Sequence, residues 1–221
     1  MVDFQSRDTS RGYGNDEGTQ DSDEEDTEES ETVEESAGDE EPTTTEAAEP
    51  TDGESEDETT DFGSETLPYA VITVANGRTI EEDATGEVIV DAIEHVGDGV
   101  STRELIGPDY DSIQSTVSAL ARRKDVEAII TVGGTGVSPD DETVDAVEPL
   151  FDKELPGFGE LYRVLSHDFD GTAVIRTRTT AGIVDGVPVF CLPDDTAGAR
   201  RGVEQIVLEE AETLSEQASR E

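Results

Sequence analysis

The sequence contains one cysteine, one methionine and no tryptophan among 221 residues. A single cysteine excludes a disulfide framework and a cysteine metal cluster, and it fits a reducing compartment. Because Cys191 lies in an apolar run with Phe190 and Leu192, we expect a buried structural thiol rather than a nucleophile. No apolar run approaches the roughly 18 residues of a membrane span, and the N-terminus lacks a basic-then-apolar signal. We therefore expect a soluble, cytoplasmic protein with no membrane contact.

Basic residues are also scarce. The chain has 14 Lys and Arg against 57 Asp and Glu, which gives a formal net charge of −43, and its only lysines are Lys124 and Lys153. No basic stripe is available to displace counterions from a phosphate backbone. This composition argues against a nucleic-acid partner.

Much of the acidic charge lies in residues 1–65, a low-complexity segment of Asp, Glu, Ser, Thr and Gly. This segment has 26 acidic residues and two arginines, so it carries −24 and leaves −19 for residues 66–221. Almost no apolar side chain is available there to offset the entropy of ordering the chain. We predict a disordered acidic tail over 1–65 without a catalytic role, followed by one domain over 66–221.

The acidity of residues 66–221 indicates a saline environment. A compact domain at −19 repels itself in dilute buffer, but in about 1 M salt the Debye length falls to about 3 Å and the repulsion is screened. Such a composition is typical of a halophile's cytoplasmic protein. The alternative, an acidic chain that sequesters basic partners such as histone-like proteins, accounts for the tail but not for the acidic domain.

A glycine-rich turn is the motif around which the domain is organised. It follows Ala128–Val132, a β-branched apolar run that predicts a buried strand, and it precedes a helix predicted from Thr143. Glycines accept positive φ and lack a Cβ, so their N–H groups can converge on an anion at a helix start. The alternative is a tight turn without a ligand. The candidate anion-binding residues are Gly133, Gly134, Thr135 and Gly136.

Alternating strands and helices are predicted before this turn. Tyr69–Val74 and a stretch within Val100–Ile106 read as strands, and helices are expected from Thr85, as a capping residue, to Val96 and from Tyr110 to Arg123. This order at this spacing predicts crossover connections and a mainly parallel sheet. Ligands of such sheets bind beyond the carboxyl ends of the strands, where the glycine turn lies.

A hairpin is predicted near the C-terminus. Asp185-Gly186 lies between two strand-like stretches, Val174–Val184 and Val187–Leu192, and this pair of turn residues favours a tight antiparallel connection. The last helix is expected from Ala197 to about Ser219. The fold class is therefore α/β, with a mainly parallel sheet and a C-terminal antiparallel hairpin.

Two aspartates are candidate magnesium ligands. Asp109 follows the second predicted strand and Asp141 follows the third, each at the start of a helix. Taking those strands as neighbours, both carboxylates would face one pocket and could hold Mg²⁺ on a phosphate-bearing substrate. The alternative for each is a helix cap. No GK[ST] or GxGxxG pattern occurs at the turn, so neither a P-loop nor a dinucleotide site is supported.

The ordered motifs of the domain resemble the MoaB/Mog family of molybdenum-cofactor biosynthesis over about residues 67–215. The segments that carry the resemblance are Thr73-Val74-Ala75-Asn76, Glu82-Asp83-Ala84-Thr85-Gly86, Pro108-Asp109, Gly133 to Asp141, Pro156-Gly157-Phe158-Gly159-Glu160, Thr177-Arg178 and Ala181-Gly182.

The resemblance implies a three-layer αβα fold, a homo-oligomer that is a trimer or hexamer, and contact with other proteins of this biosynthesis. It implies Mg²⁺-dependent adenylylation of molybdopterin by ATP, with molybdopterin-AMP and pyrophosphate as products, before molybdate or tungstate is received. Asp109 and Asp141 match positions linked to catalysis and Mg²⁺. The implied substrate-binding positions are Asp83, Thr85, Gly86, Gly133, Gly134, Thr135, Gly136, Glu160, Arg178 and Pro193.

The chain departs from the family pattern at two places. Pro193-Asp194-Asp195 stands where the family usually has Pro-Gly-Ser, and Ala75 replaces a serine. A carboxylate about 4 Å from a phosphate costs roughly 1 kcal/mol in water and more at protein-like dielectric. Two alternatives to the enzyme follow: a weakly active or inactive paralogue that binds pterin or assists assembly, and an interaction scaffold built on the acidic tail.

Overall fold

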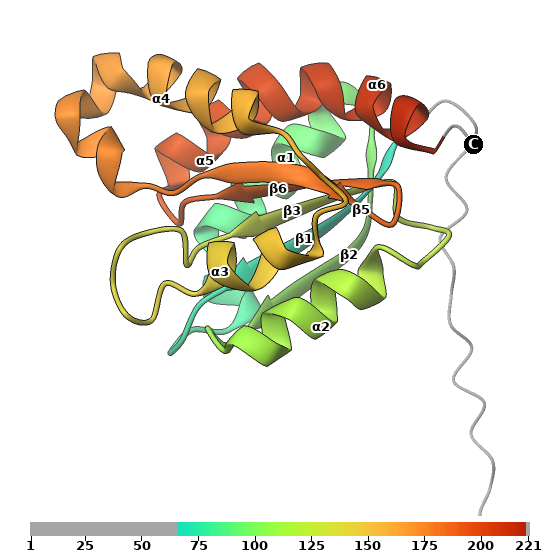
Figure 1. Ribbon diagram of the computed structural model, residues 1–221, viewed down its shortest axis with the longest axis horizontal. Coiled ribbons are helices and arrows are strands. Elements are labelled where there is room, and N and C mark those ends of the chain that lie inside the picture. The colour runs from blue at the N-terminus through green and yellow to red at the C-terminus, as the bar shows by residue number, and fades with distance from the viewer. Residues whose placement is uncertain (1–65, 220–221) are drawn as a thin grey trace, which may run out of the picture. The chain divides into compact units, whose positions relative to one another are not determined.

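A six-stranded sheet forms the middle layer of the structure, a computed structural model that describes residues 66–219 (Figure 1). The strand order is β2-β1-β3-β6-β5-β4. Neighbours from β2 to β6 pair in parallel, whereas β5 pairs antiparallel with β6 and with β4. The strands are β1 (Pro68–Val74), β2 (Gly99–Ile106), β3 (Ala128–Val132), β4 (Lys153–Glu154), β5 (Thr180–Val184) and β6 (Val187–Leu192).

Helices cover both faces of this sheet (Figure 1). One face carries α1 (Ala84–Val96), α4 (Pro156–Asp170), α5 (Thr196–Gly202) and α6 (Leu208–Ala218), and the other carries α2 (Tyr110–Leu120) and α3 (Thr143–Val147). A π-helical turn, η4 (Val203–Val207), joins α5 to α6. The short 3-10 segments are η1 (Ile80–Glu82), η2 (Glu148–Leu150) and η3 (Gly171–Arg176). The three-layer α/β fold class expected from the sequence is confirmed.

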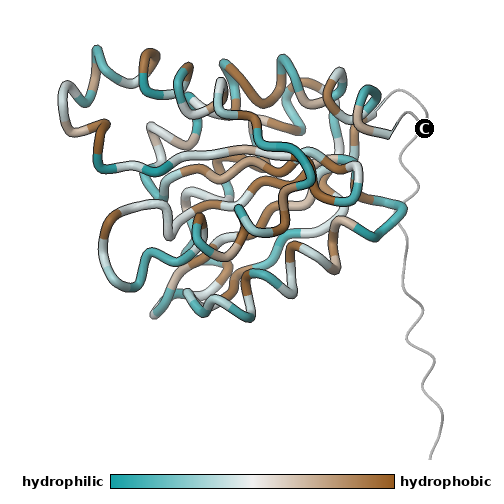
Figure 2. The backbone as a smooth tube through the Cα atoms, in the orientation of Figure 1, coloured by the Kyte–Doolittle hydropathy of each residue, from teal (hydrophilic) through white to brown (hydrophobic). Residues whose placement is uncertain are grey.

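Strict alternation along the central strands supplies a core on each side of the sheet. All seven residues of β1 are buried; Tyr69 and Val71 join the core under α1 and α4, while Ala70 and Ile72 join the core under α2. Successive side chains of a strand point to opposite faces, so a strand covered on both faces reads as a continuous apolar run. Figure 2 shows this concentration of hydrophobic residues along the strands.

The predicted burial of Cys191 is confirmed. The thiol lies in the core beneath α2 and α3 with no exposed surface, and burial raises its pKa to about 12. Among residues 66–219, no helix is both long and apolar enough to cross a bilayer. The predicted acidic tail lies outside the described residues.

The predicted neighbourhood of the second and third strands is wrong. β1 lies between β2 and β3 and pairs with both. The connection from β1 through α1 therefore leads to β2 on one side of β1, and the connection from β2 through α2 leads to β3 on the other side. Sequence adjacency does not specify this direction, and the loops that carry Asp109 and Asp141 are separated by the end of β1.

The predicted strand Val174–Val184 is also wrong in its first half. Residues Gly171–Arg176 form η3, and β5 begins only at Thr180, opposite Cys191. Continuing the hairpin would place Arg178 opposite Pro193, which has no N–H to donate to a ladder. The N–H of Arg178 instead bonds the carbonyl of Thr135 at 2.7 Å, so the chain turns toward the glycine loop.

Two predicted helix limits also change. The helix expected from Tyr110 to Arg123 ends at Leu120. Thr85 was expected to cap α1, but Asp83 is the cap, and its carboxylate accepts the N–H of Gly86 at 3.1 Å. Aspartate and threonine both cap helices, and the cap here is Asp83 because its side chain reaches a free N–H of the first turn. Thr85 lies inside the first turn and is buried.

Replacing Gly182 by alanine tests how tightly β5 packs against η2 and its following loop. A Cβ at Gly182 would lie well inside 3.0 Å of the Phe151 ring, so we expect Gly182→Ala to lower the free energy of unfolding by about 1–3 kcal/mol. Gly157→Ala is the matched control, because nothing lies within 4 Å of a Cβ placed at that exposed position. Urea unfolding in multimolar KCl measures both; wild-type stability of Gly182→Ala would contradict this packing.

Candidate functional site

The glycine loop between β3 and α3 has a packing reason for each of its glycines. Gly133 and Gly134 have φ of 98° and 65°, a region that L side chains rarely adopt. A Cβ at Gly133 would lie well inside 3.0 Å of the Val74 carbonyl, and one at Gly134 would strike the Thr143 hydroxyl. The loop is therefore compressed against the end of β1 and the start of α3, whether or not it holds a ligand.

Arg178 holds the glycine loop through hydrogen bonds from its guanidinium. Its Nε donates to the carbonyl of Gly136 at 2.7 Å, and its guanidinium also bonds the carbonyl of Asp141 and the carboxylate of Asp145, the latter at 2.7 Å. Three of its five N–H donors thus face residues of the loop and of α3. The structure gives Arg178, predicted to bind substrate, a second role as the residue that shapes the loop.

A cavity of about 390 Å³ opens beside the loop, beyond the carboxyl ends of β3 and β6. It brings together five predicted site residues: Gly134, Thr135, Gly136, Asp141 and Pro193. The remaining lining comes from α4, η3 and the segment after β6. These further residues are Tyr162, Asp170, Ala173, Val174, Arg176, Thr177, Asp194 and Asp195.

The contribution of η3 to the cavity was not predicted from the sequence. Arg176 and Thr177 lie within the stretch that was expected to be strand, and their place at the cavity depends on the turn that replaces it. Thr177 lies 3.3 Å from the hydroxyl of Thr135, oxygen to oxygen, and 2.8 Å from that of Thr179. The signal available in the sequence for Thr177 was its place in the Thr177-Arg178 segment that carries the family resemblance.

Asp141 and Asp109 lie in different surroundings. One Asp141 oxygen accepts the N–H of Ser138 at 2.8 Å, and the side chain lines the cavity. Asp109 is exposed and caps α2, where its carboxylate accepts the N–H and the hydroxyl of Ser112 at 2.9 and 2.8 Å. These bonds lower the pKa of Asp109. Asp109 is not among the residues that line the cavity.

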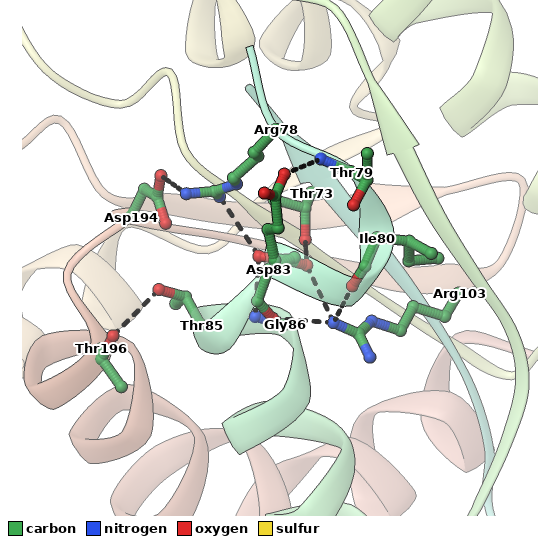
Figure 3. Close-up of polar contacts among 11 residues, drawn as sticks. Thr73, Arg78, Thr79, Ile80, Asp83, Thr85, Gly86, Arg103, Asp194 and Thr196 are labelled. Carbon is green, nitrogen blue, oxygen red and sulfur yellow. Dashed lines mark hydrogen bonds and ion pairs between the residues drawn. The ribbon is translucent and has the colours of Figure 1, made fainter. Parts of the chain in front are cut away.

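The buried carboxylate of Asp83 is the centre of a second polar cluster, drawn in Figure 3. It accepts the Thr73 hydroxyl at 2.6 Å and the Gly86 N–H at 3.1 Å, and it pairs with Arg103 at 3.1 Å and Arg78 at 3.2 Å. Burial opposes ionisation, but the bonds from Thr73, Gly86 and Arg103 outweigh it, and the pKa of Asp83 is lowered. Asp83 is thus placed to organise the end of β1.

Arg78 connects this cluster to the cavity. Its Nη1 lies 2.9 Å from the Asp194 carboxylate, while Asp195 caps α5 by accepting the Gly198 N–H at 2.8 Å. Each carboxylate that replaces the expected Gly-Ser therefore has a partner that stabilises its negative charge. One is neutralised by a guanidinium and the other is held at a helix start, where the helix dipole favours negative charge.

The other predicted site residues lie apart from the cavity. Glu160 lines a separate hollow of about 470 Å³ on the far side of Thr177 and Arg178. Thr85 lies 3.0 Å from the Thr196 hydroxyl, oxygen to oxygen, and joins the starts of α1 and α5. Gly86 packs so closely against Asp83 that a Cβ at this position would collide with the carboxylate.

The carboxylate of Asp141 suits a magnesium ion that arrives with a substrate. Among residues 66–219, no three His, Cys, Asp or Glu side chains gather to hold a metal. Mg²⁺ keeps several waters and commonly binds one or two carboxylates together with substrate phosphates, so it does not need such a cluster. Asp141 at the cavity wall fits that requirement.

Comparisons with known proteins agree with these features. Residues 62–213 match the family model described as "Probable molybdopterin binding domain". The chain is 36% identical over 141 residues to molybdenum cofactor biosynthesis protein B of Bacillus subtilis (strain 168), which covers 63% of this chain and 83% of that protein.

Solved structures share the fold. A molybdenum cofactor biosynthesis protein B superposes with a TM-score of 0.68 at 30% identity, covering 71% of this chain and 98% of the other. The tungsten cofactor synthesizing protein MoaB from Pyrococcus furiosus superposes with a TM-score of 0.63 at 29% identity, covering 71% and 99%. Each structure is matched over nearly its whole length.

Replacing Asp83 by asparagine tests the buried cluster. Because the folded-state pKa of Asp83 is lowered, its stabilisation is present above the unfolded pKa of about 3.9 and is lost as pH falls through the folded value. We expect Asp83→Asn to cost about 3 kcal/mol at neutral pH, since Arg103 and Arg78 lose a buried partner. The deficit should shrink as pH falls below about 4.

Urea unfolding at a series of pH values measures this difference. Asp185→Asn is the control, because Asp185 is exposed, pairs with Arg122 at 3.1 Å and has a φ of 49° that asparagine tolerates. It should change stability by less than about 0.5 kcal/mol. A deficit of Asp83→Asn that stays constant with pH would show that ionisation of Asp83 is not the source.

Replacing Arg178 by lysine tests whether the guanidinium holds the loop. Lysine keeps the charge but cannot bond Gly136, Asp141 and Asp145 together. We expect the amide hydrogens of Ser138 and Asp141 to exchange roughly tenfold faster, as the loss of one or two charge-assisted bonds would give. Arg122→Lys, on the exposed surface, is the control. Unchanged exchange in Arg178→Lys would refute this role.

Proposed function

The chain belongs to the MoaB/Mog family of molybdenum-cofactor biosynthesis proteins, and on that basis we propose that it is a molybdopterin adenylyltransferase. Its role in molybdenum or tungsten cofactor biosynthesis follows from the family. The single observation that supports the finer assignment is the cavity at the carboxyl ends of β3 and β6, because it joins the glycine loop, Asp141 and Pro193 in one place.

The proposed reaction joins two phosphates. An oxygen of the terminal phosphate of molybdopterin attacks the α-phosphorus of ATP. The bond between the α-phosphorus and the oxygen that bridges it to the β-phosphate breaks, and pyrophosphate leaves with the electron pair of that bond. The products are molybdopterin-AMP and pyrophosphate. Such a transfer requires positioning and charge neutralisation rather than a protein nucleophile.

The residues of the cavity would share that work. The N–H groups of Gly134 and Gly136 and the hydroxyl of Thr135 would hold the pterin phosphate, and Arg178 would keep their loop in shape. Mg²⁺ bound with ATP would neutralise phosphate charge, with Asp141 as its ligand at the cavity. Asp109 could join it only from the neighbouring loop beyond β1.

The homo-oligomer is part of the proposal. A trimer or hexamer, with contacts to other proteins of the pathway, is what the family resemblance implies for this chain. The main alternative is a paralogue that binds pterin without catalysis. That alternative was based on the charges of Asp194 and Asp195, and their engagement by Arg78 and the Gly198 N–H weakens its physical reason.

Pyrophosphate release tests the proposal. Purified full-length protein in multimolar KCl with molybdopterin, ATP and Mg²⁺ should release pyrophosphate. Asp141→Asn should lower the rate by at least about 100-fold, because the carboxylate proposed to bind Mg²⁺ beside the reacting phosphates is lost. If Asp109 also acts in chemistry, Asp109→Asn should show a similar loss. If it only caps α2, the amide oxygen of asparagine can still accept the Ser112 bonds, so stability should change by less than about 0.5 kcal/mol and the rate should stay unchanged.

Asp185→Asn is the control for both substitutions, because it removes an exposed carboxylate away from the cavity. Absence of turnover in a folded wild-type protein that still binds molybdopterin would overturn the enzyme proposal. It would also establish the binding paralogue as the function.

A further inference from the structure

We infer that Arg78 is an additional phosphate-binding residue of this site and that Asp194 occupies its guanidinium until a substrate phosphate displaces it. The inference rests on the proposed function, because it assigns a residue to the phosphate chemistry of that site. It concerns a pair that the family's usual Pro-Gly-Ser could not form, since neither glycine nor serine carries a carboxylate.

The position of Arg78 supports a binding role. It lies between β1 and η1, and its side chain, 25% exposed, extends between Asp83 and Asp194 (Figure 3). Nη1 is paired with Asp194 at 2.9 Å and Nη2 lies 3.2 Å from an Asp83 oxygen in an ion pair, whereas Nε is enclosed and has no hydrogen-bond partner among residues 66–219. An enclosed N–H donor without an acceptor is costly, so the hydrogen-bonding capacity of this guanidinium is not fully used by Asp83 and Asp194.

Asp83 forms an ion pair with Arg78 but is not its hydrogen-bond partner. The Asp83 carboxylate already accepts bonds from Thr73, Gly86 and Arg103, and its contact with Arg78 is an ion pair at 3.2 Å. The hydrogen bond that Arg78 makes with a side chain is to Asp194, and this bond raises the pKa of the guanidinium. Asp194 is therefore the partner that a ligand would have to replace.

Asp194 is placed to exchange with a ligand. It lines the cavity together with Gly134, Thr135 and Gly136, and its side chain is 29% exposed. A carboxylate and a phosphate present similar pairs of oxygens to a guanidinium, and the phosphate carries more charge. Displaced by a phosphate, Asp194 can turn into water without leaving a buried charge.

The shared chemistry is a phosphate group, which either substrate could supply. The terminal phosphate of molybdopterin and the polyphosphate of ATP are the two sources. Asp194 competes with that phosphate for Arg78 and so lowers the affinity of the protein for it. Removing the Asp194 carboxylate should therefore tighten binding only of the substrate whose phosphate reaches Arg78. Titration with each substrate separately distinguishes the two.

A competing explanation gives Asp194 no link to Arg78. In that case its charge would repel anions from the cavity rim, and its removal would tighten binding whether or not Arg78 is present. A double-mutant cycle separates the two explanations, because it measures whether the effect of one side chain depends on the other.

The experiment measures dissociation constants of the full chain by calorimetry in multimolar KCl, for molybdopterin and for Mg-ATP in separate titrations. The variants are Asp194→Asn, Arg78→Gln and the double substitution, with Asp185→Asn as the control for loss of a surface carboxylate. Arg78→Lys accompanies them, because it keeps a positive charge beside Asp83 if Arg78→Gln fails to fold.

We expect Asp194→Asn to tighten binding of one substrate roughly tenfold and Arg78→Gln to weaken it roughly tenfold, the range of a charge-assisted pair. In the Arg78→Gln background, Asp194→Asn should then change the dissociation constant less than about twofold. Arg78→Lys should weaken binding of the same substrate, since it loses the planar fork.

Three outcomes would overturn the inference: equal tightening by Asp194→Asn with and without Arg78, no change in either substrate, or no binding by any variant. A wild-type chain that binds both substrates but releases no pyrophosphate would refute the proposed enzyme and leave this cycle interpretable. Recovery of binding in Asp194→Asn from a wild type that binds neither substrate would support the inference.

Discussion

The buried carboxylate of Asp83 is the interaction on which the arrangement of the site depends. It ties the end of β1 through Thr73, the start of α1 through Gly86 and β2 through Arg103, and it holds Arg78 beside Asp194. A carboxylate without exposed surface is tolerated only because donors surround it. The same cluster therefore closes one end of the sheet and orients a cation toward the cavity.

A second set of contacts closes the other side of the cavity. β5 stops pairing where Pro193 would have to donate an N–H, and the chain before it bonds the glycine loop through Arg178. The end of the hairpin thus places Arg178 where it contacts the glycine loop. With Asp194 paired to Arg78 and Asp195 at the start of α5, the acidic substitution is accommodated by contacts that lie within the site itself.

Much of the fold follows from regular patterns. Ala128–Val132 and Val187–Leu192 appear as strands with the limits expected, because a short β-branched run between turn residues has few other ways to be buried. The place of the glycine loop and Asp141 at the cavity was predictable, because they follow a strand at the edge where α/β sheets bind ligands. Pro193 was named only through the family resemblance. Asp109 was misplaced because the order of the strands was assumed rather than encoded in any local pattern.

Local chemistry in the chain specified the identity of the strands and helices, the positive-φ glycines and the acidic surface, since each depends on neighbouring residues. Contacts between distant segments specified the rest. Asp83 meets Arg103 across 20 residues, and Arg178 meets Gly136 across 42. Such pairs arise when the sheet brings its strand ends together. The direction of each crossover, and with it the long-range ion pairs of the site, is set by the packing of the whole domain.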